Sequence, residues 1–471
     1  MSLPASLLVA PRLTPVLDPW FRPPALANRA FQARVRASGQ AVPIGIGLEQ
    51  ADGSVFRFAT TVLPAADPLA SANLHLLERW LKFLLWSRGG FRIHFAGPAE
   101  LLDGLRRHYG DTEAGRFDAE IMGGRIYERP FELVACTADG LPREKASTQP
   151  LGRHLDGCRI GFDLGGSDRK VAAVLDGRVM FSEEAVWDPI KQADPQYHFD
   201  GIMDSLKRAA AHLPRVDAIG GSAAGVYVNN RVKVASLFRS VTPDLFNARV
   251  KDLFLEIRRA WHGIPFEVVN DGEVTALAGS MALGDNAVLG IALGTSTAGG
   301  YVTPDGNITS WLNELAFVPV DLHPQAPVDE WSKDRGIGAK YFSQQAVGRL
   351  VEVAGLELSP GLGLPEILKE VQGLMEKRDH RARKIYQTIG TYLGYTIAHL
   401  ADFYDFRHLL ILGRVTSGPG GDVILKGARE VLEVEFPELA RRIALHTPDE
   451  KEKRHGQAIA AASLPTLPKP A

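Results

Sequence analysis

The sequence has little of several features that mark particular classes of protein. Its 471 residues include only two cysteines, Cys136 and Cys158, which form no CxxC pair. A disulfide framework or a cysteine-rich zinc site is therefore not expected, and a reducing cytoplasm fits this usage. No stretch approaches the ~20 apolar residues of a membrane helix. Prolines interrupt the short apolar run at the N-terminus, which lacks a basic flank, so we expect no signal peptide.

Excess charge of either sign is also absent. The formal net charge is −2, which gives no reason to expect a nucleic-acid or membrane partner. Apolar residues make up 45% of the chain and charged residues 23%, as in an ordinary globular protein. A chain of this length is too long for one core, so two or three domains are expected.

What the sequence does contain is an internal repeat. Gly161–Gly177 (GFDLGGSDRKVAAVLDG) aligns without a gap on Gly290–Gly306 (GIALGTSTAGGYVTPDG). Each copy predicts a strand, a turn of small residues, a second strand and an Asp-Gly turn, which is the pattern of a β-hairpin. Small residues in such turns leave backbone N–H groups open to phosphate. The repeat therefore predicts two related loops that grip one nucleotide across a cleft.

The pattern along the chain predicts three parts. Residues 1–28 are rich in proline and predict an extended arm, and the following residues predict a hairpin, helices and a strand in a small α/β domain. This accessory domain is expected at residues 1–150, after which strands and helices alternate as a mixed sheet requires. We expect one lobe at 157–280 and a second at 281–465, with the last helix returning to the first lobe.

Asp163 ends an apolar strand and precedes the turn Gly165, Gly166 and Ser167. A carboxylate in this position can hold Mg²⁺, directly or through water, while the loop N–H groups meet phosphates. The alternative is a plain turn carboxylate, since Asp and Gly dominate turns. The second copy of the hairpin favours phosphate binding. Lys170 could reach a phosphate or could be solvated.

Asp271 follows the strand PFEVV and precedes a helical run. It could simply cap that helix. However, a carboxylate at the end of a sheet strand lies where α/β folds bind ligands. There it could accept the proton of a hydroxyl that attacks a γ-phosphoryl group. Asn270 beside it could hydrogen-bond the same substrate.

A third glycine cluster, GRVTSG at residues 413–418, follows the apolar strand HLLIL. The order DLGGS, GGSAAG, VVNDG, LGTSTAGG and LLILGRVTSG resembles the actin, hexokinase and heat-shock ATPase superfamily and, within it, the ROK-type sugar kinases. The resemblance covers residues 159–465. It implies an α/β fold with two duplicated ribonuclease-H-like lobes and an interlobe cleft, beside the small N-terminal α/β domain.

The resemblance also implies the site residues. Phosphate and nucleotide binding falls to Asp163, Gly165, Gly166, Ser167, Gly294, Thr295, Ser296, Gly413, Ser417 and Gly418, and to these we add Lys170 from its position three residues after Ser167. Substrate binding falls to Ser222, Asn270, Asp271 and Glu314, with Asp271 as the catalytic base. The implied activity is transfer of the γ-phosphate of ATP, with Mg²⁺ at Asp163, to a sugar hydroxyl. The resemblance further implies a homodimer.

Departures from the family pattern leave other functions open. Ala316 and Phe317 stand where Gly-His is common, and no CxCGxxGC segment follows, so zinc is not predicted. A sugar-contacting Asn is missing near Ala235 to Phe238. One alternative is therefore a sugar- or nucleotide-sensing protein with weakened catalysis. Another is an ATPase that drives a change in a partner protein. A DNA-binding repressor is disfavoured, since residues 1–150 show no basic helix-turn-helix.

Overall fold

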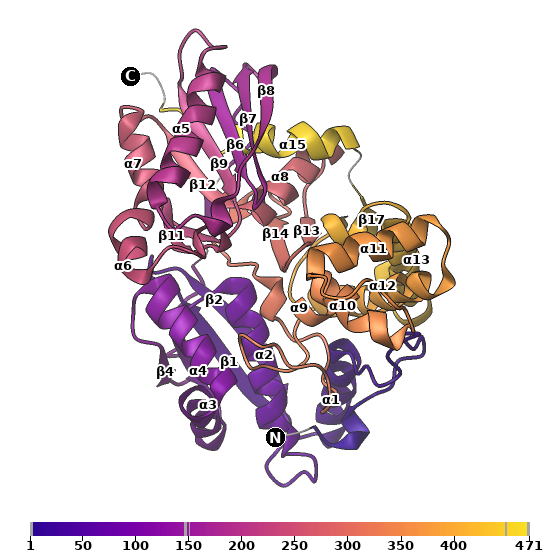
Figure 1. Cartoon of the computed structure of the whole chain (residues 1–471). Helices are drawn as coiled ribbons and strands as arrows, with labels where there is room; N and C mark the ends of the chain where they lie inside the picture. Colours follow the sequence, from indigo (N-terminus) through magenta and orange to yellow (C-terminus); the bar gives the residue numbers. More distant parts are fainter. Residues whose placement is uncertain (1–2, 146–147, 150, 448–449, 469–471) are drawn as a thin grey trace. The chain divides into compact units, whose positions relative to one another are not determined.

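The computed structural model describes residues 3–145, 148–149, 151–447 and 450–468, in two compact units (Figure 1). Unit 1 comprises Met1–Ser147, Ala292–Ala298 and Trp311–Thr447, and unit 2 comprises Thr148–Ile291, Gly299–Ser310 and Pro448–Ala471. The predicted α/β class is confirmed, since both units combine sheets with helices. The predicted domain boundaries stay predictions, and residues 146, 147 and 150 lie outside the described residues.

Unit 2 is built on a five-stranded sheet of order β12-β9-β6-β7-β8. Its strands are β6 (Cys158–Leu164), β7 (Asp168–Leu175), β8 (Arg178–Val186), β9 (Ala218–Ala223) and β12 (Phe266–Asn270). The first three form an antiparallel meander, whereas β9 runs parallel to β6 and β12 runs parallel to β9. The carboxyl ends of β6, β9 and β12 therefore meet at one edge of the sheet.

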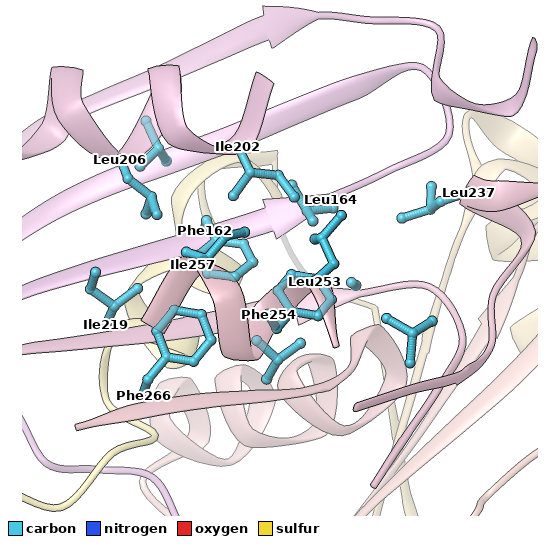
Figure 2. Packing of buried hydrophobic residues seen from close by; sticks show 14 of the residues in the cluster. Phe162, Leu164, Ile202, Leu206, Ile219, Leu237, Leu253, Phe254, Ile257 and Phe266 are labelled. Carbon is cyan, nitrogen blue, oxygen red and sulfur yellow. The ribbon is translucent and has the colours of Figure 1, made fainter. Parts of the chain in front are cut away.

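Helices cover both faces of this sheet. One face packs on α5 (Pro195–Ala210) and α7 (Leu253–Ala260), and Figure 2 shows Phe162 of β6 among Ile202, Phe254 and Phe266 in that core. The other face packs on α15 (Glu450–Ala462), which lies along β6, β7 and β9. Because both faces are covered, every residue of β6 is buried, including the charged Arg159 and Asp163.

The remaining elements of unit 2 connect these layers. They are η3 (Pro189–Lys191), β10 (Val226–Val228), β11 (Arg231–Val234), η4 (Ser236–Phe238), α6 (Pro243–Leu245), the π-helix η5 (Phe246–Val250) and α8 (Asp271–Leu283). Among the described residues no helix is long and apolar enough to cross a membrane.

The predicted repeat is confirmed as two hairpins. The second consists of β13 (Val288–Leu293) and β14 (Thr297–Val302), which correspond to β6 and β7. In unit 2, β14 pairs with β15 (Ile308–Thr309), and β15 pairs with β5 (Thr148–Gln149). The turn of the second hairpin, together with the strand ends that flank it, belongs to unit 1.

The N-terminal region, residues 3–145, contributes a four-stranded sheet of order β2-β1-β3-β4 to unit 1. Its strands are β1 (Val42–Glu49), β2 (Val55–Val62), β3 (Arg92–Ala96) and β4 (Glu132–Ala135). Its helices are η1 (Ala5–Leu7), α1 (Pro24–Ser38), α2 (Ala72–Arg88), α3 (Ala99–Asp111), α4 (Glu113–Ala119) and the π-helix η2 (Glu120–Tyr127). The extended arm is shorter than predicted, because Pro24 starts α1 and proline suits the first position of a helix.

The rest of unit 1 surrounds α12 (His380–Ala401), a long helix whose apolar face is buried as its periodicity predicts. The other elements are η6 (Leu315–Phe317), α9 (Ala339–Phe342), α10 (Gln344–Val353), α11 (Leu364–Glu376), β16 (His408–Leu412), η7 (Arg414–Thr416), α13 (Pro419–Glu435), α14 (Pro437–Arg442) and β17 (Ala444–His446). The arm is fastened to α12: Leu17 N donates to Thr388 Oγ1, and Tyr392 donates to Asp18.

A buried ionic network joins the N-terminal region to residues 329–335 within unit 1. Lys82 on α2 is fully buried, and its Nζ lies 2.7 Å from Asp118 Oδ1 and 3.1 Å from Asp334 Oδ2. Arg79, one turn earlier, donates to both oxygens of Asp334. Burial opposes the ionised form of Asp334, but these two cations outweigh it and lower the pKa of this carboxyl well below its ordinary value. Burial raises the pKa of Asp118, the other carboxyl of the network, and the Lys82 ammonium opposes that shift.

Candidate active site

The carboxyl edge of the unit 2 sheet gathers three of the predicted residues. Asp163 near the end of β6 lies opposite Ser222 of β9, and Ser222 lies in register with Val269 of β12, just before Asn270. The parallel pairing of these strands places residues from three separate sequence segments side by side. This edge is the position where open α/β sheets bind ligands.

Asp163 is a buried carboxyl group close to one cation, Lys170. Its side chain is only 9% exposed, and Lys170 Nζ lies 3.9 Å from its Oδ2. Burial raises the pKa of Asp163 above its ordinary value, and the Lys170 ammonium opposes that shift. Lys170 also lies 3.6 Å from Asp168 Oδ1, so it bridges two carboxylates at the base of the loop. Sequence reasoning gave no role to Asp168, although it directly follows Ser167.

The first predicted phosphate loop is a tight turn between β6 and β7. Gly165 N donates to Asp168 O at 2.9 Å, which closes the turn. Gly166 and Ser167 at its tip are exposed to solvent. Trp187 anchors the loop from outside, because its indole N–H donates to Gly165 O at 2.8 Å. Nothing in the sequence near Trp187 indicates this contact, which forms only when β8 folds back beside β7.

Asp271 begins α8 and is not the residue that caps it. Asn270 is the N-cap, and its Oδ1 accepts from Gly272 N at 2.7 Å, while Asp271 Oδ1 accepts from the same N–H at 3.0 Å. The alternative interpretation of Asp271 as a plain cap is therefore wrong, and its carboxyl stands on the first helical residue. Burial, and then the neighbouring Asp163 carboxyl, raise the pKa of Asp271 to about 6.

Close backbone packing pins the start of α8. A Cβ on Gly300 of β14 would lie 1.9 Å from Gly272 O, so only glycine permits this approach. The Asn270 amide donates to Gly225 O at 2.6 Å and fastens the same turn to the neighbouring β9–β10 connection. The backbone at Asp271 is therefore held on one side by the N-cap residue Asn270 and on the other by the backbone of β14.

The second predicted phosphate loop, in unit 1, has the form of the first. Gly294 N donates to Ser296 O at 3.0 Å, and Thr295 and Ser296 are exposed at the tip. Gly294 O accepts from Gln344 N at the start of α10, which ties the loop to a helix. The position that matches Asp163 is Ala292, so this loop offers backbone and hydroxyl groups without a carboxylate.

The third glycine cluster, residues 413–418, lies against this second loop. A Cβ on Gly413 would lie 2.4 Å from Leu293 O, and Gly413 has a φ of +103°. Only glycine fits both conditions. Thr416 donates to Gly413 O, while Ser417 and Gly418 are exposed at the start of α13. The structure therefore brings the second phosphate loop and residues 413–418 together within unit 1.

Glu314 lies in unit 1 directly before η6, and it is partly buried. Its backbone N–H donates to Trp86 O of α2 at 3.0 Å. Sequence reasoning placed Glu314 in the second lobe and did not anticipate this contact with the N-terminal region. No periodicity connects residues so far apart in the chain.

Among the described residues no group of three or more His, Cys, Asp or Glu side chains could hold a metal ion. Asp163 can supply one carboxylate as a ligand at this edge of the sheet. One protein carboxylate is enough for Mg²⁺ that arrives with nucleotide phosphates and keeps several waters. The donor set at this edge therefore fits Mg²⁺ carried by a nucleotide.

No family model matches the sequence, and no curated protein matches it. Solved structures match its fold. The ROK hexokinase from Thermus thermophilus is 18% identical, with 65% of this chain and 97% of that chain covered and a TM-score of 0.50. A ROK family transcriptional regulator, a homologue of the E. coli MLC protein, is 18% identical, with 66% and 79% covered and a TM-score of 0.51. The ROK family glucokinase from Streptomyces griseus, in complex with glucose and AMPPNP, is 20% identical, with 65% and 98% covered and a TM-score of 0.49.

At these identities the likeness concerns the fold. The chain has the α/β fold of the ROK-type kinases and regulators, and the fold predicted from its motifs is confirmed. The neighbours include both sugar kinases and a transcriptional regulator, so the fold by itself does not choose between the two functions.

Proposed function

We propose that this protein is a kinase that transfers the γ-phosphate of ATP to a hydroxyl group of a sugar. The observation that carries the proposal is the edge of the unit 2 sheet. There a partly exposed carboxyl, Asp271, stands on the first residue of α8 close to the Asp163 carboxyl, and Asp163 pairs with Ser222. A base beside a buried acidic residue and a small-residue loop is the arrangement that phosphoryl transfer to an alcohol needs.

In the proposed reaction Asp271 accepts the hydroxyl proton of the sugar as that oxygen bonds to the γ-phosphorus. The bond between the γ-phosphorus and the bridging oxygen breaks, and ADP leaves with the electron pair. A pKa of about 6 suits this role, because the carboxylate is about nine-tenths ionised at pH 7 yet basic enough to take a proton. The N-terminus of α8 further favours the ionised form.

Asp163 would hold Mg²⁺, directly or through water, and the ion would neutralise charge on the phosphates. Lys170 would give up part of its contact with Asp163 and Asp168 and move toward the incoming phosphates. The backbone of the two loops and the segment 413–418 would bind the nucleotide. Asn270 and Glu314 would hydrogen-bond the sugar.

The test is release of ADP by the full chain across common hexoses and amino sugars, with Asp271→Asn alongside. We expect at least one sugar to stimulate ADP release, and the variant to lose about 10²- to 10⁴-fold in kcat while it still binds nucleotide. Asp305→Asn, in an exposed turn of the same unit, is the matched control and should keep full activity. Full activity of Asp271→Asn would remove Asp271 as the base.

A second candidate is a sensing protein of the same fold with weakened catalysis. A cavity of about 570 Å³ in unit 1 favours it, because α2, α3 and residues 321–335 line this space with charged and imidazole groups. The cavity involves none of the predicted site residues. Sugar binding without ADP release from any sugar of the panel would favour the sensor over the kinase.

A further inference from the structure

The C-terminal end of α2 carries the segment that contains Glu314. The carbonyls of Trp86 and Ser87 belong to the last turn of this helix, where carbonyl groups have no partner inside the helix. They accept the backbone N–H groups of Glu314 at 3.0 Å and Asn313 at 3.1 Å. Two consecutive residues of the predicted substrate segment are thus bound to the N-terminal region through their main chain.

The conformation of that segment needs such support. Asn313 has a φ of +50° and is 1% exposed, so a residue other than glycine is held in the left-handed region inside the protein. This conformation is costly for most residues and least so for asparagine. Tyr404 donates to Asn313 Oδ1 at 2.8 Å, and Leu315 N donates to Asn313 O at 2.9 Å. The turn at Asn313 sets the direction in which the chain enters Glu314.

Arg88, the last residue of α2, holds the flanks of this turn. Its side chain is fully buried, and its guanidinium carbon lies 3.5 Å from the ring centre of Trp311 and 4.2 Å from that of Tyr404. The same guanidinium carbon lies 4.9 Å from the ring centre of Phe56 of β2, and Arg88 also donates to Phe403 O. Aromatic faces attract a cation strongly when water is absent. Arg88 therefore holds Trp311, which precedes the turn at Asn313, and Tyr404, whose hydroxyl donates to Asn313 Oδ1.

The residues after Glu314 are fixed to the same helix. The Phe317 ring lies 4.0 Å from the Trp86 ring, and Phe117 of α4 lies within 6.0 Å of both. The Trp86 indole N–H donates to buried Asp118 at 2.9 Å. The segment from Trp311 to Phe317 is thus attached to α2 before, at and after Glu314.

We propose that the N-terminal region is a working part of the sugar site, in which Arg88 and the end of α2 position Glu314. The inference rests on the proposed function, because it takes Glu314 as a sugar ligand. Arg88 is a positioning residue, since it acts through Trp311 and Tyr404. The region would then determine the affinity for sugar and have little influence on the affinity for ATP.

Three variants of different severity test this. Arg88→Met removes the cation, and Tyr404→Phe removes only the hydroxyl that bonds to Asn313. We expect Tyr404→Phe to raise the sugar KM about fivefold, as the loss of one hydrogen bond allows. Arg88→Met should raise the sugar KM further, and Arg88→Lys should restore part of it. The ATP KM should stay within about twofold in all three. Arg125→Met, which breaks an exposed ion pair of the N-terminal region, is the matched control and should change neither KM.

Hydrogen exchange separates this inference from the proposed function, because it requires no activity. In the wild-type chain the amides of Asn313 and Glu314 should exchange slowly, and Tyr404→Phe and Arg88→Lys should accelerate their exchange while the amides of α12 stay protected. Unchanged exchange at residues 311–317, or sugar and ATP KM values that rise together, would overturn the inference. A wild-type chain that phosphorylates no sugar would overturn the kinase function, and the exchange data would still decide whether α2 holds this segment.

Discussion

Replacing Asp271 by asparagine should stabilise the folded protein at neutral pH while it removes the proposed base. Burial and the Asp163 carboxyl raise the pKa of Asp271 from 3.8 to about 6. The difference is about two units at about 1.4 kcal/mol each, so the ionised carboxylate opposes folding by about 3 kcal/mol at most. Asp271 is partly exposed, and water screens part of this energy, so we expect about 1 to 2 kcal/mol. Asparagine keeps an oxygen that can accept from Gly272 N.

The sign of the pH dependence makes this prediction specific. The folded pKa lies above the unfolded one, so the folded state binds the proton more tightly. The wild type therefore loses stability from this group as the pH rises from about 4 to about 6, and the full penalty applies above that range. The gain in folding stability of Asp271→Asn over the wild type should be near its maximum at pH 7.5 and should shrink toward pH 4.5.

Thermal and denaturant unfolding of both chains at these two pH values measure the effect. Asp305→Asn, in an exposed turn of the same unit, is the control variant. A gain in Asp271→Asn that is equal at both pH values, or a loss at pH 7.5, would refute the reasoning that burial and a like charge raise this pKa.

Three further predictions concern the pH profile of activity, Gly413 and Lys82. If Asp271 is the base, kcat/KM for the sugar should fall about tenfold per pH unit below about pH 6, and a flat profile would contradict this. Gly413→Ala should weaken nucleotide binding and lower the Tm, because its Cβ would overlap a strand backbone, whereas Gly373→Ala meets nothing within 4 Å and should do neither. Lys82→Met should destabilise unit 1 by about 3 to 5 kcal/mol, because two buried carboxylates lose a shared cation. The exposed Lys426→Met is its control in denaturant unfolding, and equal losses would contradict the role of the network.

The amino-acid sequence by itself determined the two hairpins and the order of the glycine loops. Alternation of apolar residues and the Asp-Gly turns are local signals, and each hairpin closes over fewer than about twenty residues, so periodicity suffices to predict them. The same signals placed Asp163 at the end of one strand and Asp271 directly after another. Parallel pairing of β6, β9 and β12 then brought these strand ends to one edge.

Only the tertiary structure decided which of Asn270 and Asp271 caps α8, because both residue types favour the N-cap position. The tertiary structure also decided the attachment of Glu314 and the burial of Arg88 and Lys82. Lysine and arginine are usually exposed, so their pattern in α2 gives no sign that aromatic rings and carboxylates will enclose them. The contacts of Lys82 with Asp334 and of Arg88 with Trp311 join residues more than two hundred positions apart, and they form only when separate segments pack together.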